Sequence, residues 1–203
     1  WPENRTGGWT YSAHFTPDFK KDSSGERYDF YNKPFGVQHW LKSHPAVDGD
    51  GVGGNTDTGR PPLANKNTVL AVVDPDFLFL RALTVAINKT NDSNPPAVVG
   101  KGAPMGQLYG LGAPWTRAAN QNINLRTPKG KPNFFNLHDI CGAGSPCLDV
   151  QEPEGNLHYA VGPPYVVHIS DFGRLVDTWV KFVPRVFKGY PHLLAEMYAY
   201  VLA

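Results

Sequence analysis

Apolar positions along the chain fall into short blocks, and the two most continuous blocks predict strands. The segments VLAVV (69–73) and YVVHI (165–169) are rich in β-branched residues and do not alternate with polar ones. Continuous runs of this kind are typical of strands that are buried on both faces. The segment FLFLRAL (77–83) continues the first block and is expected to form a short strand or turn. The pattern therefore predicts a buried sheet.

Residues 32–44 (NKPFGVQHWLKSH) carry the signals of a helix. Asn32 is a good N-cap, and Pro34 suits the first turn. Three apolar residues recur at helical spacing and share one face: Val37, Trp40 and Leu41. We therefore expect a helix here that presents this face to the core.

Two more helices are expected after the second strand. Over 170–183, Ser170 is the expected N-cap, and apolar residues recur at helical spacing at Phe172, Leu175, Val176, Trp179, Phe182 and Val183. Pro184 is expected to end or kink this helix. A last helix is expected to begin near Pro191 and to run through LLAEMYAYVLA. Strands that alternate with helices predict an α/β layer architecture, here in a single domain.

The segments between these blocks are rich in Gly and Pro and predict irregular structure. Residues 1–27 hold at most one short strand, near WTYSAHF, and residues 45–67 are expected to form a long flexible insertion. The aspartates of this insertion do not match an EF-hand loop, because Val52 and Gly59 stand where two oxygen ligands are needed. Residues 88–157 are loop-rich and are expected to lean on the core through Tyr109, Trp115, Phe134 and Phe135.

Composition narrows the class of protein. The chain has 203 residues, of which 41% are hydrophobic and 18% are charged, as in a globular domain with a real core. Its 19 Lys and Arg against 18 Asp and Glu leave a net charge of +1, so no basic field favours nucleic acid or an anionic membrane. Because the chain begins at Trp1 and stops inside an apparent helix, we expect it to be a piece of a longer, processed protein.

The cysteines and the glycosylation signals point to the secretory pathway. Cys141 and Cys147, in CGAGSPC, suit a small disulfide loop; two free thiols are the alternative, and His138 alone is too little to complete a zinc site. Three Asn-X-Ser/Thr triplets are present, at Asn4, Asn88 and Asn91. Together these features favour a secretory or extracellular location.

Asp74 and Asp76 raise the clearest chemical question, because they directly follow the apolar run VLAVV. In α/β sheets, ligand groups gather beyond the carboxyl ends of strands, and Pro75 stiffens the turn between the two aspartates. Two carboxylates there suit Mg²⁺ or Mn²⁺, which would in turn hold a diphosphate. The alternative is a capped turn in which the aspartates accept backbone N–H groups.

Four segments extend this hypothesis through a resemblance: NKPFGVQHWLK, NTVLAVVDPDFLFLRAL, GPPYVVHISDFGRLVDTWVKFVPRV and YPHLLAEMYAYVLA. In this order they resemble the plant and algal hydroxyproline O-arabinosyltransferases and their relatives, the peptidyl serine α-galactosyltransferases. The resemblance implies a GT-A-like fold and a metal-dependent transfer of sugar, in the Golgi, from a UDP-sugar to hydroxyproline or serine of a secreted acceptor protein.

The resemblance also assigns site residues. It implies that Asp74 and Asp76 bind Mn²⁺ or Mg²⁺ and the donor diphosphate. The helix from Asn32 to Trp40 would pack behind the donor pocket, with Asn32 and Lys33 among the donor-binding residues. Glu196 would lie on the acceptor side of the cleft as the catalytic carboxylate.

Glu196 also stands out from the residues alone, because the segment LLAEMYAYVLA has almost no other polar side chain. A lone carboxylate in an apolar helix needs a partner or a function. The alternative to a functional role is an ion pair with Arg185 or Lys188.

Two departures from the family pattern keep a second class of function open. No strand and helix for the nucleotide base is recognisable before Asn32, and the His that the family places beyond EMYAY is absent; His158, His168 or His192 would have to replace it. The second hypothesis is a non-catalytic secreted module that binds glycans or builds an extracellular assembly.

Overall fold

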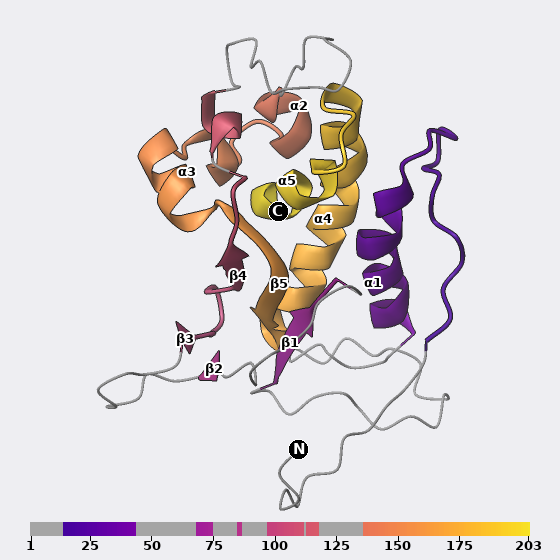
Figure 1. Cartoon of the computed structure of the whole chain (residues 1–203), viewed down its shortest axis with the longest axis horizontal. Coiled ribbons are helices and arrows are strands. Elements are labelled where there is room, and N and C mark those ends of the chain that lie inside the picture. The colour runs from indigo at the N-terminus through magenta and orange to yellow at the C-terminus, as the bar shows by residue number, and fades with distance from the viewer. Residues whose placement is uncertain (1–13, 44–67, 75–84, 87–96, 112, 118–135) are drawn as a thin grey trace, which may run out of the picture.

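The computed structural model describes residues 14–43, 68–74, 85–86, 97–111, 113–117 and 136–203. Within them the chain is mixed α/β, with a small antiparallel sheet and helices packed against it (Figure 1). The elements follow in the order η1 (Asp29–Tyr31), α1 (Asn32–Lys42), β1 (Val69–Val72), β2 (Val85–Ala86), β3 (Ala97–Val98), β4 (Met105–Leu108), η2 (Pro114–Arg117), α2 (Leu137–Cys141), η3 (Pro146–Leu148), α3 (Glu152–His158), β5 (Val161–His168), α4 (Ile169–Gly189) and α5 (Ala195–Leu202).

The main sheet has the strand order β1-β5-β4, and both pairings are antiparallel. Val72 of β1 and Gly106 of β4 both lie opposite Tyr165 of β5. The central strand β5 is almost continuously buried, as its apolar run predicts. It is longer than expected, because it begins at Val161 and ends at His168, one residue before the predicted end.

The strand β1 corrects an expectation. The run VLAVV was expected to be buried on both faces, but Ala71 is exposed and Val73 is 40% exposed. Among the described residues β1 lies at the edge of the sheet, with β5 on one side only. An apolar run shows that a strand suits burial, but its place in the sheet depends on distant pairing.

Helices α4 and α5 cover the sheet and hold most of the core (Figure 1). Trp179 of α4 packs edge-on against Tyr165 and Tyr200, and these two tyrosines stack with ring centroids 3.6 Å apart. Helix α1 packs on the other end of α4, where Val37, Trp40 and Leu41 contact the cluster formed by Val167, Phe172 and Val176. The shared apolar face predicted for α1 is therefore confirmed.

Three helix boundaries differ from the prediction. Asn32 is the first residue of α1 rather than its N-cap, which is Tyr31. Ser170 lies inside α4, where the side chain of His168 is the cap and accepts the Ser170 N–H at 3.2 Å. Pro184 does not end this helix, which continues to Gly189.

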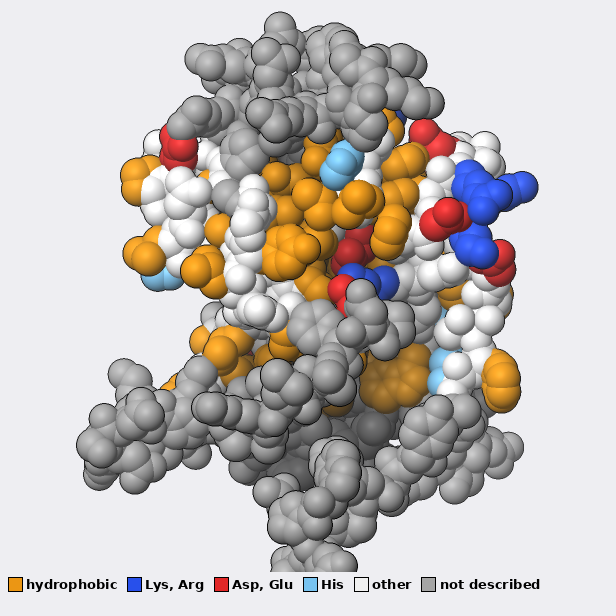
Figure 2. All heavy atoms as spheres, viewed as in Figure 1, with side chains coloured by type: hydrophobic (Ala, Val, Ile, Leu, Met, Phe, Trp, Pro, Cys, Tyr) orange, Lys and Arg blue, Asp and Glu red, His pale blue; other side chains and the backbone are white. Residues whose placement is uncertain are grey.

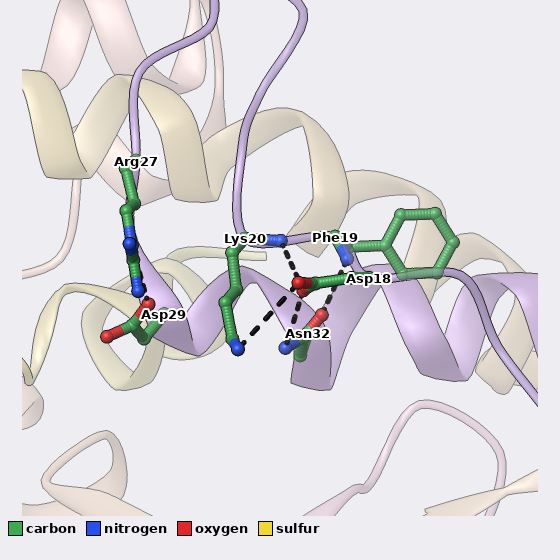
Figure 3. A network of polar contacts seen from close by, with 6 residues as sticks. All are labelled: Asp18, Phe19, Lys20, Arg27, Asp29 and Asn32. Carbon is green, nitrogen blue, oxygen red and sulfur yellow. Dashed lines mark hydrogen bonds and ion pairs between the residues drawn. The ribbon is translucent and has the colours of Figure 1, made fainter.

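The side chain of Asn32 is used elsewhere (Figure 3). Its Oδ1 accepts the Phe19 N–H at 2.7 Å, and its amide nitrogen donates to Asp18 at 3.4 Å. Asn32 therefore fixes the chain before η1 to the first turn of α1. This long-range bond competes with the local cap that the sequence predicts.

Residues 88–157 contain more regular structure than expected, namely β3, β4, η2, α2, η3 and most of α3. Trp115 is buried as predicted, whereas Tyr109 is 46% exposed and does not pack into the core as expected. The last helix also starts later than predicted, at Ala195. Phe134, Phe135, residues 45–67, residues 77–83 and most of WTYSAHF lie outside the described residues.

The predicted disulfide between Cys141 and Cys147 is present, with Cα atoms 6.6 Å apart. It joins the end of α2 to η3. Arg185 of α4 donates to the carbonyl of Ile140 at 2.8 Å and so fastens this loop to the long helix. In the described part of the chain, no helix is both long enough and apolar enough to span a membrane.

Candidate functional site

Three residues from distant segments meet at one point. Lys33 lies in the first turn of α1, Asp74 is the second residue after the end of β1, and Glu196 lies in the first turn of α5. The ammonium of Lys33 lies 2.6 Å from Asp74 Oδ1 and 3.0 Å from Glu196 Oε2. We call this group the Lys33 cluster.

The Lys33 cluster is largely withdrawn from water. The side-chain exposures are 18% for Lys33, 27% for Asp74 and 2% for Glu196. In Figure 2, a small group of acidic and basic side chains is set among hydrophobic ones near the middle of the described part of the chain. Charges this buried are strongly coupled, because little water screens them.

Neighbouring groups fix the position of Glu196. The hydroxyl of Tyr28 accepts the Glu196 N–H at 3.0 Å and donates to the carbonyl of Leu193 at 2.7 Å. The indole N–H of Trp179 donates to the Glu196 carbonyl at 3.0 Å. Both ends of the Glu196 peptide unit are therefore held by aromatic side chains. The carboxylate can keep one orientation as a result.

The aromatic ring of Tyr165 forms one wall of the cluster. The Lys33 ammonium lies 6.0 Å from the centre of this ring, at the outer limit of a cation–π contact. Four buried oxygens have no hydrogen-bond partner among the described residues: Glu196 Oε1 and the hydroxyls of Tyr31, Tyr165 and Tyr200. Unpaired buried polar atoms are rare in proteins and need an explanation, such as a water or a ligand.

The electrostatics favour a proton on Glu196 near neutral pH. Burial raises the pKa of the Glu196 carboxyl to about 7, against the opposing effect of Lys33 and with a further rise from Asp74. Burial alone would lower the pKa of Lys33, but Glu196 and Asp74 together raise it.

The raised pKa of Glu196 favours its neutral form, whereas the raised pKa of Lys33 favours its charged form. The presence of Asp74 explains how both can hold. One ammonium cannot neutralise two carboxylates. Lys33 stays charged beside Asp74, and the more deeply buried Glu196 is the group that takes a proton. The same negative charges, after burial itself, raise the pKa of the Tyr165 hydroxyl.

The structure brings together some of the predicted site residues and separates others. Lys33, Asp74 and Glu196 converge, whereas the Asn32 side chain is engaged with Phe19 and Asp18. The alternative considered for Glu196, an ion pair with Arg185 or Lys188, is wrong, because Lys33 is its partner and Arg185 binds Ile140. Asp76 and the three predicted glycosylation sites, Asn4, Asn88 and Asn91, lie outside the described residues.

The described residues alone do not fit the expected divalent cation. The Lys33 ammonium already occupies the space between Asp74 and Glu196, and it would repel a metal ion placed beside it. No group of three or more His, Cys, Asp or Glu side chains suited to a metal occurs in the described ranges. His168 and His192 instead accept backbone N–H groups of Ser170 and Leu194. The metal site at Asp74 and Asp76 stays a prediction.

Sequence reasoning missed the aromatic residues that hold the cluster, chiefly Tyr28, Tyr165 and Trp179. The only available signal was their aromatic character, which equally predicts core packing. The Tyr28 hydroxyl and the Trp179 indole bind the Glu196 backbone, and the Tyr28 contact spans 168 residues in sequence. Such contacts leave no local pattern.

Comparisons with known proteins add no family to this picture. A scan against known protein families, a search of curated proteins and a search of solved structures found no match.

Proposed function

We propose that the Lys33 cluster is the donor site of a glycosyltransferase, which moves a sugar from a UDP-sugar to a hydroxyl of a hydroxyproline- or serine-rich secreted protein. One observation carries the proposal. Lys33, Asp74 and Glu196 were each selected by resemblance to such enzymes, on segments up to 163 residues apart, and they share one buried set of ion pairs.

Lys33 suits the binding of a diphosphate. Its ammonium is held in place by two carboxylates and is partly shielded from water, so an anion that displaced a carboxylate would meet a positive charge that water screens only weakly. A diphosphate that approaches Lys33 would compete with Asp74 and Glu196 for this charge. The positive charge would also stabilise the diphosphate as it departs.

Glu196 suits the role of proton acceptor. In the transfer, the acceptor oxygen forms a bond to the anomeric carbon, and the bond from that carbon to the diphosphate oxygen breaks. UDP leaves with the electron pair, and the proton of the acceptor hydroxyl passes to a base. Glu196 Oε1 has no hydrogen-bond partner among the described residues, and a pKa of about 7 matches a base that works near neutral pH.

Further parts of the proposal rest on the resemblance alone. They are the GT-A-like fold, a divalent cation held by Asp74 and Asp76, and a Golgi location. No step above depends on the cation. A donor-binding titration in EDTA, and again with added Mn²⁺, tests whether the cation takes part.

A second candidate function is favoured by the same ion pairs. The two carboxylates and Lys33 satisfy most of one another's charge, so the cluster could serve only to join α1, β1 and α5. The protein would then be a non-catalytic secreted module that binds glycans or takes part in an extracellular assembly.

The experiment that separates the two functions is a transfer assay. UDP release is measured from UDP-galactose and from UDP-arabinofuranose, with a hydroxyproline- and serine-rich peptide as acceptor. Glu196→Gln should lower the rate at least ~100-fold if Glu196 is the base. Glu154→Gln, at an exposed position in α3, is the matched control and should leave the rate unchanged. Absence of transfer by the wild-type protein, or equal rates in Glu196→Gln, would contradict the proposal.

A further inference from the structure

An exposed tyrosine packs against β5, the strand that borders the Lys33 cluster, and has no role in the account so far. Tyr109 follows β4 directly, and its backbone N–H donates to the carbonyl of Ala160 at 2.8 Å, just before β5 begins. Its backbone is therefore fixed to the sheet. Its side chain remains 46% exposed, although the residue was expected to pack into the core.

Because Gly162 has no side chain, the Tyr109 ring can pack against the backbone of β5 at this residue. A Cβ atom at Gly162 would lie 2.9 Å from the ring Cγ of Tyr109 and 2.6 Å from Cε of Met197. Both distances are too short for any side chain. The ring and Met197 therefore lie together against the backbone of β5, and Met197 is the residue next to Glu196 in α5.

Tyr165 lies three positions farther along β5 and links the ring to the charged groups. The Lys33 ammonium lies 6.0 Å from the centre of the Tyr165 ring. The strand that carries the Tyr109 ring at Gly162 therefore also borders the Lys33 cluster. Hydrophobic side chains surround the acidic and basic group in Figure 2.

We propose that Tyr109 is the residue on which the sugar of the donor stacks. The C–H groups on one face of a pyranose or furanose carry partial positive charge and pack well against the negative face of an aromatic ring. A ring fixed at its backbone, half open to water and packed on the strand that borders the Lys33 cluster offers such a surface. The inference rests on the proposed function and adds to it the group that recognises the sugar.

Titration calorimetry with two probes isolates the contribution of the sugar. UDP reports the nucleotide and diphosphate alone, and UDP-galactose reports them with a hexose. The variants are Tyr109→Ala, which removes the ring, and Tyr109→Trp, which keeps an aromatic surface. Leu108→Ala is the matched control, because Leu108 is the neighbouring residue and is 75% exposed. Circular dichroism confirms that each variant is folded.

The expected result is selective. Tyr109→Ala should bind UDP-galactose about tenfold more weakly and UDP as the wild type does, since a ring stacked on the sugar contributes on the order of 1 kcal/mol. Tyr109→Trp and Leu108→Ala should bind both probes normally. The reciprocal experiment is Gly162→Ala, which displaces the ring and should weaken UDP-galactose binding alone.

Two results would overturn the inference, and they are distinguishable. If the wild type binds both probes and Tyr109→Ala binds both equally well, stacking on Tyr109 is refuted and the proposed function stands. If the wild type binds neither probe, with or without Mn²⁺, the proposed function and this inference fall together.

Discussion

At the residue scale, one ammonium serves two carboxylates, and this imbalance explains most of the behaviour expected of the site. Lys33 lies within ion-pair distance of both Asp74 and Glu196, and Glu196 is the most deeply buried of the three. With all three groups ionised, one negative charge remains in a poorly solvated place. A proton on Glu196 relieves it, and the uptake of a proton near neutral pH is what a catalytic base requires.

The raised pKa of Glu196 predicts a pH-dependent stability. The pKa is about 7 in the folded protein, against an ordinary value of 4.5. Between these values the folded state binds more protons than the unfolded state, so the free energy of unfolding falls as the pH rises. From pH 5 to pH 8, the titration of Glu196 alone should lower the free energy of unfolding by roughly 2–3 kcal/mol.

Urea unfolding of the wild type and of Glu196→Gln at both pH values measures this effect. The variant lacks the titrating group, so its stability should fall less over the same range. All other ionisable groups are the same in both proteins, so their contributions cancel in the comparison. Parallel changes in the two proteins would show that Glu196 keeps an ordinary pKa.

Removal of the Lys33 ammonium should destabilise the folded protein. Lys33→Met leaves two carboxylates without their shared partner and should lower the free energy of unfolding by about 3–5 kcal/mol at pH 8. Adding Glu196→Gln to this variant should recover part of the loss, because the most buried charge is then absent.

The control for this prediction is Lys20→Met. Lys20 pairs with Asp18 at 3.7 Å on the surface (Figure 3), where the two side chains are 43% and 64% exposed, and its loss should have no measurable effect. Equal effects of Lys33→Met and Lys20→Met on urea unfolding would mean that the Lys33 cluster is not a buried ionic group.

The sequence identified the members of the cluster but not their partnership. Asp74 was found from its position after an apolar run, Glu196 from its isolation in an apolar helix, and Lys33 through the family resemblance. That Lys33 joins the other two depends on how α1 packs beside α5. No spacing in the chain encodes that arrangement, and the local alternatives, Arg185 and Lys188, were the natural but incorrect choice.

At the scale of the elements, the type of each main element was predictable and its ends were not. The helices α1 and α4 follow their apolar periodicity, and α1 presents the predicted face. Their caps differ because His168 replaces Ser170 in one helix and Asn32 bonds to Phe19 in the other. Cap preferences are worth about 1 kcal/mol, so a competing tertiary contact can override them.

The disulfide gives a prediction at this scale. It closes a loop of sequence separation 6 between α2 and η3. The free energy of unfolding of the double variant Cys141→Ser/Cys147→Ser should be about 2 kcal/mol lower than that of the wild type, because a short loop constrains the unfolded chain only modestly. Helix α2 should remain docked, since Arg185 holds the Ile140 carbonyl independently.

Thermal unfolding with and without a reducing agent measures this contribution. Reduced wild type and the double variant should unfold at the same temperature. If the reducing agent leaves the wild-type transition unchanged, the disulfide does not form in the protein.

At the scale of the whole molecule, the sequence predicted the mixture of strands and helices but not the antiparallel sheet. The central place of β5 follows from its apolar run, while β4, in MGQL, gives almost no strand signal. Pairing with β5 makes β4 a strand, and such pairing is long-range. The same sheet sets Asp74, Tyr165 and Tyr109 near one another, so the candidate site is a product of tertiary structure.

The central claim is that the Lys33 cluster is a ligand site and not merely a structural tie, and one measurement tests it most directly. The side-chain carboxyl of Glu196 is titrated by carbon NMR in protein labelled at glutamate, with and without UDP-galactose, and Glu196→Gln assigns the signal. We predict a carboxyl that titrates near pH 7 and whose pKa rises further when the donor diphosphate draws the Lys33 charge away. A Glu196 titration that UDP-galactose leaves unchanged, with Mn²⁺ present or absent, would contradict the account.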